Sequence, residues 1–137
     1  MAELLLTDLG RLIEGRSEEE ILAELQQRGV EAVLGQIFAA IAAAFVPEVA
    51  TGKTAIVQFE VSAPDGVHIY QLKCAGGKCV VQKDTGEAAR LTIFLALPDF
   101  VRLVVGKFDG MQAFLSGKLR LSGDIMLAQA MPRWFKR

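Results

Sequence analysis

The hydrophobic spacing of this chain changes once, near residue 53, from the period of a helix to the period of a strand. Before this point, apolar side chains recur every three or four positions, as they do on one face of a helix. After it, the alternating apolar positions of a half-buried strand are Ala55, Val57, Phe59 and Val61. Because helices precede the strands instead of alternating with them, the pattern favours an α+β domain over a doubly wound α/β domain.

Three helices are predicted before residue 47. The apolar side chains at helical spacing in the first are Leu5, Leu9, Leu12 and Ile13. Ser17, followed three positions later by Glu20, forms a capping box that begins the second helix, and Gly29 ends it. The third is expected to run from Val30 to Val46, with a broad apolar stripe and many alanines that permit close packing.

Four further strands are predicted at about 67–74, 78–83, 91–97 and 118–122. Gly76 and Gly77 supply the positive backbone angles of a two-residue hairpin turn, so Cys74 is expected opposite Cys79. The alternation then places on one face Tyr70, Leu72, Cys74, Cys79 and Val81. This register allows a cross-strand disulfide, but two reduced thiols that pack as small apolar groups are favoured, because the sequence shows no export signal.

Two segments hold more apolar material than a tight core obviously requires. The first comprises residues 100–105 and 111–115, in two short helices, of which the earlier opens at Pro98. The second is 126–135, where Asp124 is expected to cap a helix and Pro132 to end it. These side chains either cover one face of the sheet or line a cavity, for which unbranched, polarisable methionine is well suited. Composition alone leaves both interpretations open.

Composition and charge exclude several classes of function. The 15 basic and 16 acidic residues give a net charge of −1, without the basic surface that nucleic acid requires. Two cysteines and one histidine are too few for a structural zinc site, and neither a metal nor another cofactor is predicted. His68 has no nucleophile and acid nearby in the sequence, so the chain is not expected to be an enzyme. The uncharged stretch 32–47 is shorter than the roughly 20 residues that cross a bilayer, and a cytoplasmic location is expected.

Three segments with a characteristic spacing carry a family resemblance. Residues 100–107, 113–119 and 122–126, which read FVRLVVGK, AFLSGKL and SGDIM, resemble the signature of the sterol carrier protein type 2 domain. The resemblance implies an α+β fold with a five-stranded, largely antiparallel sheet, helices on one face and an apolar tunnel for a long-chain lipid, without catalysis. Because it covers about residues 30–131, we divide the chain into a helical extension, 1–29, and a domain, 30–137.

The resemblance also implies which side chains face the tunnel: Phe100, Leu103, Phe114, Leu115 and Met126. Val104, Met111 and Met131 lie in the same apolar segments and complete the candidate lipid-binding set. The implied ligands are fatty acids, fatty acyl-CoA, sterols and isoprenoids, either bound or transferred. The extra helices are expected to cover the tunnel mouth, add a dimer contact or extend the core.

A second function is compatible with the same residues. The fold could have a filled core and act as an interaction or accessory module, through a partner enzyme or a homodimer. The extra N-terminal helices favour this alternative, as does Phe94, which lies opposite the main apolar row of its strand. An enclosed cavity of roughly 300 Å³ or more, the lower range for ligand sites, favours the lipid carrier instead.

Overall fold

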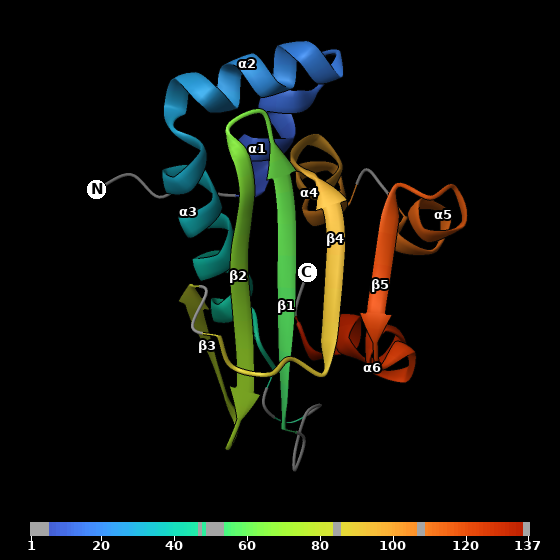
Figure 1. Cartoon of the computed structure of the whole chain (residues 1–137). Coiled ribbons are helices and arrows are strands. Elements are labelled where there is room, and N and C mark those ends of the chain that lie inside the picture. Colours follow the sequence, from blue (N-terminus) through green and yellow to red (C-terminus); the bar gives the residue numbers. More distant parts are fainter. Residues whose placement is uncertain (1–5, 47, 49–53, 84–85, 107–108, 136–137) are drawn as a thin grey trace.

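The computed structural model describes residues 6–46, 48, 54–83, 86–106 and 109–135. They form a five-stranded sheet with helices against one face, while the other face is open in the view of Figure 1. The predicted positions Leu5 and Lys107 lie outside the described residues. The fold class is α+β, as expected from the sequence.

The strands are β1 (Ala55–Ala63), β2 (Gly66–Ala75), β3 (Lys78–Lys83), β4 (Leu91–Ala96) and β5 (Leu119–Gly123). Their order in the sheet is β3-β2-β1-β4-β5. Three of the four neighbouring pairs are antiparallel, and β1 pairs with β4 in parallel. A largely antiparallel sheet of five strands is therefore confirmed.

The helices are α1 (Leu6–Ile13), α2 (Glu18–Arg28), α3 (Val30–Ala43), α4 (Leu97–Val104), α5 (Gly110–Leu115), α6 (Ile125–Ala130) and the 3-10 turn η1 (Met131–Trp134). The prediction that the third helix reaches Val46 was wrong. Phe45 instead forms a β-bridge with Phe135, and the Val46 amide donates to the Trp134 carbonyl at 2.6 Å. The last α-helix ends at Ala130, just before Pro132 as expected, and the chain continues through this proline as the 3-10 turn η1.

The β2–β3 hairpin has the predicted register. Cys74 pairs with Cys79 across a turn in which Gly76 and Gly77 have φ of 60° and 76°. The two cysteines are free thiols with their Sγ atoms 3.4 Å apart, as the sequence favoured. Their hydrogen bond raises the pKa of Cys79, and burial acts in the same direction.

We expect mild oxidation to join these two thiols within one molecule. Hydrogen peroxide would accept the two electrons and two protons that the thiols lose, which gives one disulfide and two water molecules. Mass spectrometry of the intact chain should show a mass lower by about 2 Da, because two hydrogens leave. The variant Cys79→Ser should keep its mass in the absence of a second thiol. Disulfide-linked dimers as the main product of the wild-type chain would contradict the expectation.

A cluster of four aromatic side chains occupies the centre of the core. Phe38 on α3 is fully buried, and its ring centroid lies 4.6 Å from Tyr70, 5.1 Å from Phe100 and 5.2 Å from Phe59. The cluster thus joins α3, the sheet and α4. Stacked and edge-to-face pairs at these separations add stability beyond that of the area they bury.

The N-terminal extension packs on the domain and extends its core. Ile21 and Leu25 of α2 are 1% and 0% exposed, and α2 contacts both α3 and α4. Arg102 of α4 pairs with Glu18 at 3.1 Å and with Asp99 at 3.4 Å. Burial raises the pKa of Asp99, and the nearby carboxylate of Glu18 on α2 acts in the same direction. The independence of residues 30–137 as a folding unit stays a prediction.

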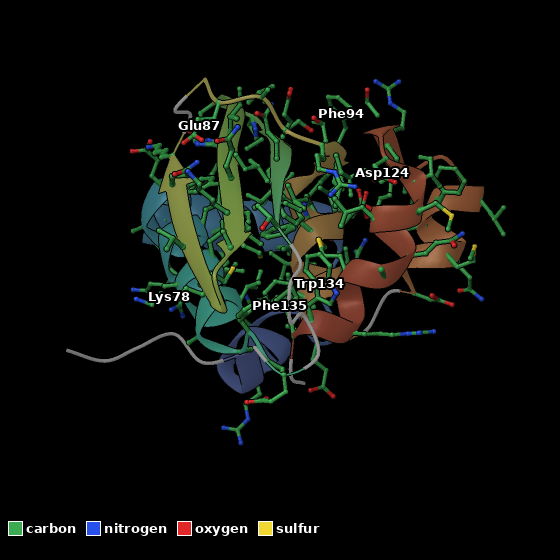
Figure 2. The ribbon with its side chains drawn as sticks, turned by 90° about the horizontal axis from the view of Figure 1, so that it is seen from below. Lys78, Glu87, Phe94, Asp124, Trp134 and Phe135 are labelled. Atoms are coloured by element: carbon green, nitrogen blue, oxygen red, sulfur yellow. The ribbon has the colours of Figure 1, made fainter. Side chains whose placement is uncertain are left out.

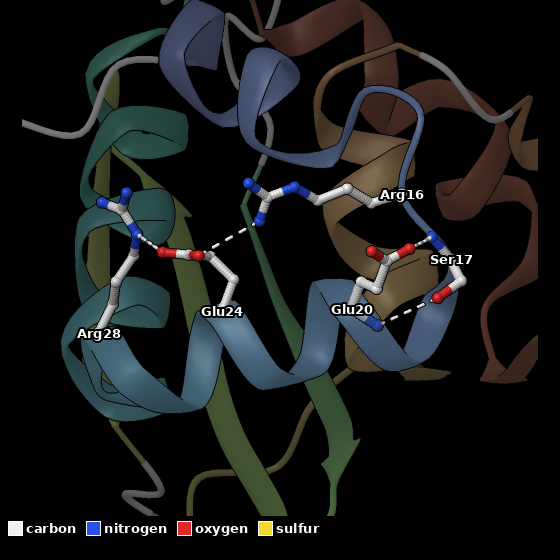
Figure 3. A network of polar contacts seen from close by, with 5 residues as sticks. All are labelled: Arg16, Ser17, Glu20, Glu24 and Arg28. Carbon is white, nitrogen blue, oxygen red and sulfur yellow. Dashed lines mark hydrogen bonds and ion pairs between the residues drawn. The ribbon is translucent and has the colours of Figure 1, made fainter.

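The predicted capping box at the start of α2 is present. The Ser17 hydroxyl accepts from the Glu20 amide at 3.2 Å, and the Glu20 carboxylate accepts from the Ser17 amide at 2.9 Å (Figure 3). On the same helix Glu24 pairs with Arg28 at 3.0 Å and with Arg16 at 3.2 Å, so the turn before α2 is tied to its exposed side (Figure 3). These local contacts orient the face that carries Ile21 and Leu25 toward the core.

The connection from β3 to β4 crosses the open face of the sheet. Gln71, on this face of β2, is completely buried, and its side-chain amide donates to the Glu87 carbonyl and to Gln58, both at 2.9 Å. Figure 2 shows Glu87 and Phe94 on this side of the sheet and Trp134 and Phe135 on the helical side. The crossing places β4 beside β1, in parallel with it.

Gly123 ends β5 where the chain approaches β4 most closely. Its φ is +109°, and a Cβ atom would lie 2.3 Å from the Arg90 carbonyl oxygen. That oxygen also accepts from the Asp124 amide at 2.8 Å. Gly117, just before β5, has φ of +80° but open space around the position of a Cβ.

We expect Gly123→Ala to destabilise the fold much more than Gly117→Ala. Alanine at 117 meets only the strain of a left-handed backbone, about 1–2 kcal/mol. Alanine at 123 must also displace the Arg90 backbone. The free energy of unfolding should therefore fall by at least about 3 kcal/mol in this variant. Urea unfolding of the two variants measures the difference. An equal decrease in the free energy of unfolding for both variants would show that the backbone at the β4–β5 junction shifts to accommodate the added methyl group.

Candidate functional site

A cavity of about 900 Å³ lies between the inner face of the sheet and the helices. Its sheet side is formed by Phe59, Leu72, Ile93, Leu119 and Leu121. Opposite them lie side chains from α3, α4, α5 and α6, together with the segment that follows α6. Strand alternation produces the apolar face, because every second residue of β1, β2 and β4 points to this side.

The structure places six of the eight predicted site residues along this cavity: Phe100, Leu103, Val104, Met111, Phe114 and Met131. The other two, Leu115 and Met126, are not part of the lining and are 75% and 76% exposed. Each directly follows a lining residue, Phe114 and Ile125 respectively, and consecutive side chains on a helix point about 100° apart. The expected tunnel-facing position of Leu115 and Met126 therefore differs from the structure, whereas the lipid-binding role of the other six stays a prediction.

Sequence reasoning missed the wall that α3 contributes. Ala40 on α3 and Ala44, which directly follows α3, lie four residues apart next to Ile41, and all three line the cavity. Small side chains at this spacing leave room for a ligand, whereas the sequence alone indicates only close helix packing. Phe135 was also missed as a lining residue, although it lies in a segment noted for its apolar content.

Polar side chains occur only at the border of the described lining. They belong to Asp109 and Gln129, both exposed to solvent. The Asp109 carboxylate caps α5 by accepting from the Met111 amide at 3.1 Å. The remaining lining side chains are aliphatic, aromatic or thioether groups, besides one glycine, so the cavity can shield an apolar chain while a polar end group stays near the border.

The start of α6, on the far side of the cavity, is held by Asp124. Its carboxylate accepts from the Leu127 amide at 3.1 Å and from Arg90 at 2.6 Å. The hydrogen bond from the Leu127 amide lowers the pKa of Asp124, and Arg90 adds to the effect. A depressed folded pKa stabilises the fold above the ordinary pKa of the group, and this contribution is lost as the pH falls through the folded value.

Neither a metal-ligand cluster nor a membrane-spanning helix occurs in the part of the chain that the structure describes. No three His, Cys, Asp or Glu residues gather there in a way that could hold a metal ion. No helix within the same described ranges is long and apolar enough to span a bilayer.

The fold and the cavity define a small α+β domain with an apolar site, and a comparison with known families shows which family it belongs to. A model of the SCP-2 sterol transfer family matches residues 36–136. The chain belongs to this family. The resemblance found in the three sequence segments is thereby confirmed.

The curated relatives are much longer proteins. Hydroxysteroid dehydrogenase-like protein 2 of Mus musculus is 39% identical over 82 residues, which are 59% of this chain and 16% of that protein. Peroxisomal multifunctional enzyme type 2 of Mus musculus is 40% identical over 60 residues, 44% of this chain and 8% of the relative. The chain thus matches about a sixth or less of the length of these proteins.

Solved structures share the fold. The sterol carrier protein 2-like 2 of Aedes aegypti has a TM-score of 0.61 at 22% identity, and the match covers 78% of this chain and 96% of that one. The sec-alkylsulfatase Pisa1 of Pseudomonas sp. has a TM-score of 0.66 at 17% identity, over 74% of this chain and 16% of the enzyme. Sterol carrier protein 2 of Yarrowia lipolytica, in its apo form, is 27% identical with a TM-score of 0.50, over 56% of this chain and 62% of that one.

Proposed function

We propose that this chain binds one long-chain lipid in the cavity between sheet and helices and catalyses no reaction. The observation that carries the proposal is the cavity itself, about 900 Å³ with an almost wholly apolar lining. Ligand sites begin at roughly 300 Å³, so the space exceeds what a packing defect would leave. The candidate ligands are fatty acids, fatty acyl-CoA, sterols and isoprenoids, and a cytoplasmic location is part of the proposal.

The apolar lining supplies enough free energy for useful affinity. Burial of a methylene group contributes about 0.8 kcal/mol, so a chain of about sixteen carbons gains on the order of 10 kcal/mol before association costs. After association costs of several kcal/mol are subtracted, the remaining free energy still corresponds to micromolar binding. Discrimination between chain types should be weak, because one methylene more or less changes affinity only modestly.

A solved structure of the same fold supports a hydrocarbon ligand. The sterol carrier protein 2-like 2 of Aedes aegypti was determined in a palmitated form, with a TM-score of 0.61 to this chain at 22% identity. By analogy, an acyl chain lying between the sheet and α4–α6 is the arrangement that we propose here.

Two measurements test the proposal together. Native mass spectrometry after mild extraction should detect a co-purified lipid, and a fluorescent fatty acid added to delipidated protein should bind with a stoichiometry of about one to one. A nonfluorescent sterol or acyl-CoA should displace the fatty acid if all share the cavity. Neither co-purified lipid nor uptake of any of these probes would count decisively against lipid binding.

The carboxylate of Asp109 at the cavity border predicts a preference among end groups. A fatty acid whose carboxylate lies near Asp109 meets like-charge repulsion, whereas a long-chain alcohol does not. Asp109→Asn keeps a side chain that can cap α5 and should raise affinity for palmitate about threefold, with little effect on hexadecanol. Displacement of a fluorescent fatty acid by palmitate and by hexadecanol measures the two affinities. An equal change for hexadecanol would mean that the carboxylate of palmitate does not lie near Asp109.

A second candidate is an accessory module that presents lipid to an enzyme or works as a homodimer. The observation in its favour is that the matched relatives carry the similar region as 8–25% of longer proteins, some of them named as dehydrogenase-like. The version of this alternative with a filled core fits poorly with a cavity of about 900 Å³. Phe94, which motivated a dimer, is half-buried with the Arg120 guanidinium 5.9 Å from its ring centroid. Light scattering that shows a dimer, broken by Phe94→Ser, would favour the module.

A further inference from the structure

The N-terminal extension lies against the outer side of α4, the helix whose inner side forms one wall of the cavity. Phe100, Leu103 and Val104 of α4 line the cavity, as does Val105, which directly follows the helix. Both α1 and α2 contact α4, and Figure 1 shows the three helices together at one end of the sheet. The match to the family model begins at residue 36, so this wall is supported by a part of the chain outside that match.

The two ends of α4 are held in different ways. Phe100, near the start of the helix, is fully buried and anchored in the aromatic cluster, with its ring centroid 5.1 Å from that of Phe38. At the other end, Leu103, Val104 and Val105 border the cavity. A helix that borders a cavity lacks packing contacts on that side, so its position depends on the contacts on its other side. The end of α4 is therefore the part of the wall that the N-terminal extension has to hold.

Gly10, in the interior of α1, faces this end of the wall. A Cβ atom at position 10 would lie 4.0 Å from the Cβ atom of Val105, which is ordinary van der Waals contact. Alanine therefore fits here and should favour α1, because glycine is the poorer helix former of the two. A larger side chain would bring further carbon atoms closer to Val105, so either α1 or the end of α4 would have to move.

A polar contact fixes α4 against α2. The Arg102 guanidinium of α4 lies 3.1 Å from the Glu18 carboxylate and 3.4 Å from the Asp99 carboxylate. The side chains of Arg102 and Asp99 are 24% and 11% exposed, so the guanidinium is held in one place between the two helices. Glu18 is placed by the capping box that begins α2 (Figure 3), and the rotation of α4 about its axis is thereby coupled to the position of α2.

We propose that the N-terminal extension is part of the lipid site: by holding the end of α4 from outside, it sets the width of the cavity and hence the affinity for lipid. Gly10, Glu18 and Arg102 are positioning residues in this arrangement, because they act on the wall and do not line the cavity. The proposal rests on the proposed function, since the width of the cavity affects binding only if lipid occupies it.

Substitutions of two glycines test the contact between α1 and the wall. Gly10→Ile adds a branched side chain that has to displace the wall or α1, whereas Gly10→Ala stays within the available space. The matched control is Gly35→Ile in the interior of α3, where a Cβ atom meets nothing within 4 Å outside its own helix and the residue does not line the cavity. Titration with parinaric acid, a slender fluorescent fatty acid, measures the affinity of each variant, and thermal unfolding without lipid measures its stability.

Gly10→Ile should weaken the binding of parinaric acid about tenfold, because a displaced wall loses contact with the equivalent of one or two methylene groups. Gly10→Ala and Gly35→Ile should bind within about twofold of wild type, although both isoleucine variants add the same side chain to a helix. The loss of affinity should therefore not follow the change in Tm across the three variants.

A second pair of variants tests the polar contact without adding bulk. Glu18→Gln removes the charge that Arg102 meets, and Glu19→Gln removes the same charge from the same turn of α2. In Glu18→Gln the backbone amides of residues 101–106 should exchange hydrogen severalfold faster, as measured by mass spectrometry, whereas the β2–β3 hairpin should exchange as in wild type. The affinity of this variant should fall about threefold. Glu19→Gln should leave exchange and affinity unchanged, and this pair decides the question also if Gly10→Ile fails to fold.

The contrary outcomes are distinct. If Gly10→Ile binds parinaric acid as wild type does, whatever its Tm, the extension only packs on the domain and the proposal is overturned. Equal losses of affinity in Gly10→Ile and Gly35→Ile overturn it as well, and so do unchanged exchange and affinity in Glu18→Gln. No binding of parinaric acid by the wild-type chain, together with no co-purified lipid, overturns the proposed function itself.

Discussion

The double substitution Ala40→Trp, Ala44→Trp should reduce lipid affinity by about 100-fold while the protein stays folded. Ala40 on α3 and Ala44 directly after it both line the cavity, so two indole rings would occupy space that an acyl chain needs. Exclusion of three or four methylenes at about 0.8 kcal/mol each removes about 3 kcal/mol of binding free energy, which corresponds to about two orders of magnitude in the dissociation constant. Titration with a fluorescent fatty acid measures the loss.

The same helix offers a matched control. Ala39 and Ala43 precede the two lining alanines by one residue each and are exposed. Ala39→Trp with Ala43→Trp adds the same side chains to the surface of α3 and should leave affinity within about twofold of wild type. Full binding by the inward pair would mean that the lipid lies elsewhere and would contradict the proposed site.

Phe38→Ala should cause the second large effect, a loss of stability of about 3–5 kcal/mol. Phe38 is completely buried at the centre of the aromatic cluster, and its ring contacts Phe59, Tyr70 and Phe100. Its removal leaves a hole that the surrounding helix and sheet cannot close, so the lost contacts are not recovered. At roughly 3 °C per kcal/mol for a chain of this size, Tm should fall by about 10–15 °C.

Phe94→Ala is the control for this prediction, because Phe94 lies half-buried on the opposite face of the sheet. The free energy of unfolding of the Phe94→Ala variant should fall by less than about 1.5 kcal/mol. Differential scanning calorimetry of both variants makes the comparison. A Phe38 variant no less stable than the Phe94 variant would show that the core adapts freely around α3.

Local rules predicted the elements that depend on neighbouring residues. The Gly76–Gly77 turn set the register of the hairpin, because a two-residue loop allows only one pairing of the flanking strands. The capping box at Ser17 placed the start of α2 for the same kind of reason, since its bonds span three residues. Both predictions needed no knowledge of the rest of the chain.

Features that depend on distant contacts were beyond sequence reasoning. The end of α3 is decided by a bridge between Phe45 and Phe135, residues from opposite ends of the domain. Leu115 and Met126 were assigned to the tunnel because their segments resemble the family signature, but a motif identifies a helix more reliably than it identifies the inward residue on that helix. The role of Ala40 in the lining depends on which side of α3 faces the gap, and that is fixed only by packing of the complete fold.

The bridge between Phe45 and Phe135 also bears on when the cavity forms during synthesis. Phe135 lines the cavity, its ring centroid lies 5.7 Å from that of Phe45, and α6 borders the same space. Residues 125–135 are the last described residues to be synthesised, and until they fold onto α3 the apolar inner face of α3 and β1–β4 has no cover on this side. The folding chain therefore completes the cavity late, and before that step this face is open to chaperones and to aggregation.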